Sequence, residues 1–76
     1  MKELATAIRF QRKALGLTQS ALAQFAGCST VFVVQVEAGK PTLQLHKLLA
    51  VLNVLGLQLR LERGKKGLVA DKGLAQ

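Results

Sequence analysis

The sequence predicts a mainly helical domain of four to five helices that ends in a single β-strand. Apolar residues recur at helical spacing through residues 2–15, 19–25 and 42–55. The spacing then changes to strict alternation over residues 57–63, which is typical of a half-buried strand. Glycines, which readily adopt the left-handed conformation that ends helices, follow the three helical segments: Gly16, Gly27 and Gly56.

The starts of the helices are marked by residues that cap helix N-termini. Thr18 stands directly before the second helix, and Thr42 before the fourth. The fourth helix, over residues 42–55, is apolar on more than one face, so we expect it to be buried on two sides.

Residues 30–37, TVFVVQVE, give conflicting local signals. Their β-branched and aromatic side chains favour a strand. Their setting favours a helix, because Ser29 is a good N-cap and Gly39 a good stop. We predict a helix here.

The strand at residues 57–62 has no persuasive partner elsewhere in the sequence. We therefore expect it to pair with the same strand of a second subunit across a homodimer. Residues 1–63 would form the domain, and residues 64–76 a flexible basic tail available to DNA or to a protein. The residues expected to carry the dimer strand are Leu57, Leu59 and Leu61.

The charge balance favours a polyanionic partner. Eleven Lys and Arg face four acidic residues, giving a net charge of +7, which suits nucleic acid or an anionic membrane. The longest apolar run, residues 48–52, is too short to span a bilayer, and the N-terminus is unlike a secretory signal, so we expect a cytoplasmic protein without membrane contact.

Few residues are suited to covalent, metal or catalytic chemistry. Cys28 is the single cysteine and His46 the single histidine, so we expect no internal disulfide, metal site or cofactor. No Ser-His-Asp set or carboxylate pair is present, and we expect no enzymatic activity. Cys28 is predicted to pack as a small apolar residue, and His46 to point outward.

Two of the short helices form a recognisable unit. Residues 18–25, the turn at Gly27 and Cys28, and residues 29–37 follow the order helix, tight turn, helix. This is the helix-turn-helix layout, in which the second helix enters the major groove of DNA.

Three segments resemble the Cro/phage-repressor (Xre) family: RFQRKALGLTQSALA at residues 9–23, AGCS at 26–29 and VEAGKPT at 36–42. The continuation, LLAVL at 48–52 and LGLQL at 55–59, resembles the HipB-like antitoxin branch. The resemblance covers roughly residues 4–62. It implies a lambda-repressor-like homodimer that represses its own toxin–antitoxin operon by binding an inverted-repeat operator in double-stranded DNA, with a HipA-like kinase toxin as partner.

The resemblance also implies residue roles. Base edges would be read by Thr30, Val31 and Gln35. Contacts to the DNA backbone would come from Gln19, Ser29, Phe32, Lys40 and Thr42. A partly buried ion pair with a structural role would join Arg12 and Glu37.

The predicted reading helix is unusually apolar. Gln35 alone could make a bidentate contact, to adenine, whereas Val31 and Phe32 can only pack on thymine methyls or sugars. Base preference should therefore favour A·T pairs, helped by DNA shape. The alternative is an interaction module that neutralises a toxin kinase and has little affinity for DNA.

The residues expected in the core are apolar members of the first three helices. They are Phe10, Leu22, Phe25, Val33 and Val36.

Overall fold

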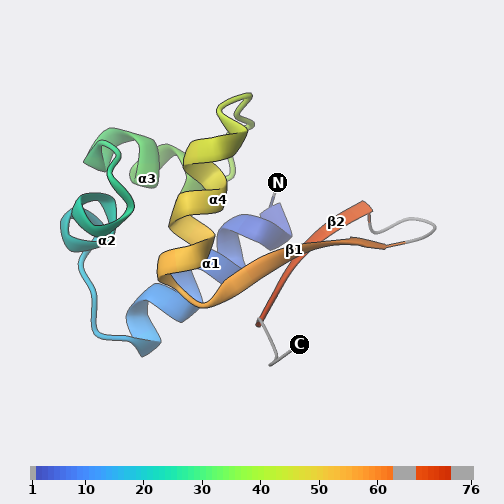
Figure 1. The fold of residues 1–76 in the computed structure, drawn as a ribbon, viewed down its shortest axis with the longest axis horizontal. Helices are drawn as coiled ribbons and strands as arrows, with labels where there is room; N and C mark the ends of the chain where they lie inside the picture. Colours follow the sequence, from blue (N-terminus) through green and yellow to red (C-terminus); the bar gives the residue numbers. More distant parts are fainter. Residues whose placement is uncertain (1, 63–66, 73–76) are drawn as a thin grey trace.

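The structure is a computed structural model that describes residues 2–62 and 67–72. Four helices form a bundle, and a two-stranded hairpin stands out from one side of it (Figure 1). The elements are α1 (Lys2–Ala14), α2 (Gln19–Ala26), α3 (Thr30–Glu37), α4 (Leu45–Val54), β1 (Leu57–Glu62) and β2 (Gly67–Lys72).

The boundaries of α2 confirm the predicted start and stop signals. The Thr18 hydroxyl accepts a hydrogen bond from the backbone N–H of Ala21 at 2.9 Å. Gly27 follows the last turn with a φ of 72°, in the left-handed region, and its N–H donates to the Gln24 carbonyl. Both ends of this short helix are therefore fixed by local chemistry.

Residues 30–37 form a helix, as predicted against their β propensity. The Ser29 hydroxyl accepts from the backbone N–H of Phe32 at 3.0 Å and caps α3. Phe32, Val33 and Val36 then bury one face of α3 in the core. Burial of that face outweighs the small propensity cost of β-branched residues in a helix.

The start of α4 differs from the prediction. The helix begins at Leu45, and Thr42 does not cap it. The Thr42 hydroxyl instead accepts from the N–H of Gln44, only two residues ahead, at 3.0 Å. Threonine side chains readily form such local turns in place of a helix start.

The core lies where the four helices and the start of β1 meet. Leu22, Val33 and Val36 are buried, as predicted. The largest side chains excluded from solvent are Ile8, Leu22, Val33, Val36, Val51, Leu52 and Leu55. On α4 the prediction holds in part: this helix packs against both α2 and β1, yet Leu45 and Leu49 remain about half exposed.

Two aromatic residues predicted in the core are exposed, so that prediction was wrong for them. Phe10 is 71% exposed and Phe25 is 69% exposed. Phe10 lies about 200° around α1 from the buried Ile8, because each residue turns a helix by about 100°. Phe25 lies at a similar angle from the buried Ala23 on α2.

The strand β1 has a partner in its own chain, which corrects the expectation that none exists. β1 pairs with β2 in an antiparallel ladder that runs from Leu57 opposite Lys72 to Glu62 opposite Gly67. Residues 67–72, expected to belong to a flexible tail, form this second strand; residues 63–66 and 73–76 lie outside the described residues. This strand was hard to predict from the sequence, because β2 contains only a three-residue apolar run and lacks a clear alternation of apolar and polar residues.

The hairpin is attached to the bundle by both strands. β1 lies against α4, and β2 lies against α1. Leu57 is buried, and Leu59 packs against the core at partial exposure. The side chain of Leu61 falls outside the described residues.

Candidate nucleic-acid interface

The turn between α2 and α3 sets the relative placement of the two helices. Gly27 takes the left-handed conformation, and the N–H of Cys28 donates to the Ala23 carbonyl at 2.9 Å. Ser29 then caps α3 immediately. The two helices pack directly on each other and lie at one edge of the bundle, apart from the hairpin (Figure 1).

One face of α3 is open to solvent. Thr30, Val31 and Gln35, predicted to read bases, are all exposed on it. Val34, an apolar residue of the predicted reading helix with no base contact assigned to it, joins them at 43% exposure. Helical spacing places Val34 on this face, because residues 31, 34 and 35 follow the i, i+3, i+4 pattern.

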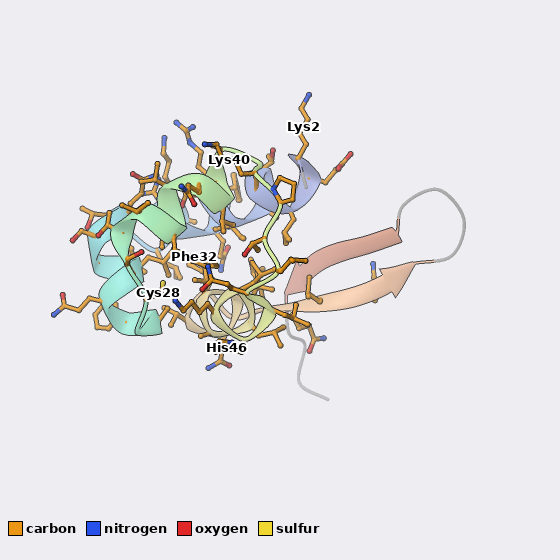
Figure 2. The ribbon with its side chains drawn as sticks, turned by 90° about the horizontal axis from the view of Figure 1, so that it is seen from above. Lys2, Cys28, Phe32, Lys40 and His46 are labelled. Atoms are coloured by element: carbon orange, nitrogen blue, oxygen red, sulfur yellow. The ribbon has the colours of Figure 1, made fainter. Side chains whose placement is uncertain are left out.

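The prediction that Phe32 contacts DNA is corrected by the structure. Phe32 is only 6% exposed and belongs to the hydrophobic core. In Figure 2 it lies between α3 and the rest of the bundle. Ser29 remains exposed at the start of α3, although its hydroxyl is occupied by the cap.

A buried polar cluster ties α3 to the first two helices. The guanidinium of Arg12 forms the predicted ion pair with Glu37, with Nε to Oε2 at 2.7 Å and a second bond to Oε1 at 3.1 Å. A third donor of Arg12 reaches the Leu17 carbonyl at 2.8 Å. The two charged side chains are only 10% and 4% exposed, so the pair is shielded from solvent.

Gln19 belongs to the same cluster. Its Nε2 donates to Glu37 Oε1 at 3.1 Å. An amide NH₂ has two hydrogens, so one remains for another acceptor. A phosphate contact by Gln19 therefore stays a prediction compatible with this bond.

The loop after α3 places polar groups beside the open face. A hollow of about 330 Å³ lies between α3 and this loop, and its lining includes Gln35, Lys40 and Thr42. Lys40 is exposed, and in Figure 2 it lies toward the same side as Lys2, with His46 toward the opposite side. A predicted base-reading residue and two predicted phosphate-contacting residues therefore share one concave surface.

Two further cations lie near the end of α3 that carries Glu37. Arg9 and Lys13 are exposed on α1, one turn apart, and line a hollow of about 310 Å³ together with Glu37. Sequence reasoning did not single them out. Their i, i+4 spacing places both cations on one face of α1, the helix that packs against α3, and this spacing could have identified them.

Cys28 and His46 have no site-like surroundings. Cys28 is partly buried, and this burial raises the pKa of its thiol, while the charge of Lys47 acts in the opposite direction. His46 is exposed, as predicted. Within residues 2–62 and 67–72, no three His, Cys, Asp or Glu residues gather as metal ligands would, and no helix there is long and apolar enough to cross a bilayer.

Comparison with known proteins identifies similar sequences. A family model described as helix-turn-helix matches residues 8–61. The chain is also 42% identical over 57 residues to the uncharacterized HTH-type transcriptional regulator y4mF of Sinorhizobium fredii (strain NBRC 101917 / NGR234), which covers 75% of each protein. The family match includes the α2–α3 unit, the ion pair and the loop with Lys40.

Proposed function

Since this chain belongs to the helix-turn-helix family, we propose that it is a sequence-specific DNA-binding transcriptional repressor of the cytoplasm that lays α3 in the major groove. The observation that carries the proposal is the single exposed face of α3, which presents Thr30, Val31, Val34 and Gln35. The opposite face is fixed in the core, so this exposed face has a defined orientation.

The distribution of charge supports a DNA partner. The chain carries a net charge of +7, and Lys40 lies beside the open face of α3. Cations at such positions bind phosphates and release counterions, which makes affinity fall steeply with salt. In this proposal the DNA backbone is contacted by Gln19, Lys40 and Thr42, while α3 contacts the base edges.

Two substitutions separate base reading from phosphate binding. We expect Gln35→Ala to relax the preference for one base pair by about 1–3 kcal/mol, because a bidentate contact to adenine is lost. Lys40→Ala should weaken binding to all sequences alike and lower the salt slope by about one ion. Fluorescence anisotropy with the chain's own promoter fragment and a random duplex, at two salt concentrations, measures both effects.

The control for this experiment is His46→Ala. This residue is exposed and lies on the side of the molecule opposite Lys40 (Figure 2), so its loss should leave binding unchanged. Equal affinity for promoter and random DNA would contradict sequence-specific binding. Unchanged affinity in both Gln35→Ala and Lys40→Ala would contradict the docking of α3.

The proposal includes a homodimer that binds an inverted repeat. Two copies of α3 would then lie about 34 Å apart, one turn of DNA. The sheet supports this, because a two-stranded sheet leaves an outer backbone edge on each strand, and such edges favour pairing with another chain. In this arrangement the β1–β2 hairpins of two subunits would meet, in place of two single strands.

Sedimentation velocity tests the dimer. We expect the full chain to sediment as a dimer at micromolar concentration, and a chain ending at Gly56, without β1 and β2, to sediment as a monomer. Far-UV circular dichroism of the truncated chain records whether its helices persist. A monomeric full chain, or a tight dimer of the truncated chain, would refute dimerisation through the hairpin.

We further propose a HipB-like antitoxin role, with a HipA-like kinase as the toxin. Its support is the resemblance over residues 48–59, together with the apolar side chains on α3. The second candidate function is a protein-interaction module, favoured by the 63% exposure of Val31 and the 43% exposure of Val34. Co-purification with the kinase-like product of a neighbouring gene tests both, and DNA binding without that product distinguishes them.

A further inference from the structure

We propose that α3 recognises C5-methyl groups of pyrimidines through Val31 and Val34. The ligand is then a duplex in which thymine, or 5-methylcytosine, lies on neighbouring base pairs beside an adenine bound by Gln35. This inference rests on the proposed function and specifies what the same face reads.

The exposed valines are the structural basis. Val31 is 63% exposed and Val34 is 43% exposed, while the three apolar neighbours on the other face of α3 are buried at 6% or less. The exposed valines therefore do not complete the core of the chain. With Phe32 buried, they are the only large apolar side chains that α3 can present to a groove.

The spacing of the two valines fits DNA. Residues i and i+3 on a helix have Cβ atoms about 5–6 Å apart. Successive bases along one strand are about 3.4 Å apart. The separation of the Cβ atoms thus spans between one and two base steps, so Val31 and Val34 can reach pyrimidines on neighbouring base pairs. Gln35, one helical turn from Val31, can reach the adjoining base pair.

The chemistry of the major groove identifies what a valine can distinguish. A valine side chain has no hydrogen-bonding group, and the apolar feature that the groove displays is the C5-methyl of thymine. 5-Methylcytosine carries its methyl at the same ring position, whereas uracil and cytosine have hydrogen there. Valines therefore distinguish methylated from unmethylated pyrimidines, and Gln35 adds two hydrogen bonds to adenine.

The valines are held in place before DNA arrives. Val31 lies in the first turn of α3, next to the Ser29 cap, and the far end of the helix is fixed by the Arg12–Glu37 pair. β-Branched side chains also have one strongly preferred rotamer in a helix. Little conformational entropy is then lost when the methyl groups meet.

The test begins from duplexes that the full chain selects from a random library. Each thymine of a selected duplex is replaced in turn by deoxyuridine, which removes one methyl group and keeps every hydrogen-bonding atom. We expect binding to weaken about fourfold at each thymine that contacts a valine, the equivalent of one buried carbon group. The same positions are then occupied first by cytosine and then by 5-methylcytosine. Methylation of the cytosine should strengthen binding by the same factor.

A double-mutant cycle assigns the effect to the valines. Val31→Ala and Val34→Ala should each weaken binding to the thymine duplex and have no further effect on the matching uracil duplex. Both positions are exposed, so the variants should fold normally. Gln35→Ala is the matched control, because its loss of affinity should be equal on thymine and uracil duplexes.

The outcomes separate this inference from the proposed function. Selected duplexes that bind equally with thymine and uracil would overturn methyl reading and leave the repressor proposal standing. Selection that enriches no sequence would overturn both, and would leave the apolar face of α3 as a surface for a protein.

Discussion

Replacing Glu37 with alanine is expected to lower the free energy of unfolding by about 3–5 kcal/mol, because the Arg12 guanidinium would be left buried without its counterion. The loss is large for a chain of this length, whose total stability is expected to be about 4–11 kcal/mol. The Gln19 amide would lose its acceptor as well. Urea denaturation, monitored by the helical signal in far-UV circular dichroism, measures the change in the free energy of unfolding.

The control is Glu3→Ala, which removes an exposed acidic residue from the first turn of α1. It should cost less than about 1 kcal/mol. Replacing both partners, as Arg12→Met with Glu37→Leu, should recover much of the loss, since a buried apolar pair needs no counterion. If Glu37→Ala matches Glu3→Ala in stability, the pair does not hold α3 in place.

Leu22→Ala is expected to destabilise the chain by about 2–5 kcal/mol. The Leu22 side chain is fully buried, and its truncation leaves a cavity in the centre of the core. Thermal and urea unfolding give the difference from the parent chain. DNA binding at a temperature where the variant stays folded should change little, because Leu22 lies away from the exposed face of α3.

Phe25→Ala is the informative comparison, because it removes a larger side chain from the same helix. Phe25 is 69% exposed, so its loss should shift the free energy of unfolding by no more than about 0.5 kcal/mol. A loss comparable with that of Leu22→Ala would mean that Phe25 is buried in solution.

Sequence patterns predicted the helical part of the fold well. Capping residues and glycines determine the ends of α2 and α3. Because they act over only a few residues, they can be recognised in the sequence. The second strand was not predictable in the same way. β2 is short and poorly alternating, and its pairing depends on contact with β1 and α1, which no local pattern records.

The candidate site was predictable to the level of the helix but not of each side chain. The ion pair of Arg12 with Glu37 and the exposure of Thr30, Val31 and Gln35 followed from the family resemblance. Phe32 was misplaced because one position on a helix turns a side chain by about 100°, enough to move it from groove to core. Similar rotations explain Phe10 and Phe25.

The local pairing of β1 with β2 determines when each chain can finish folding. The two strands are separated by residues 63–66 alone, so closing them costs little loop entropy, and hairpins of this kind form in about 1–10 μs. A newly made chain can therefore complete its sheet before it meets a second copy. Folding would then be independent of how many copies a cell holds, and only the proposed association of two subunits would depend on the concentration of the protein.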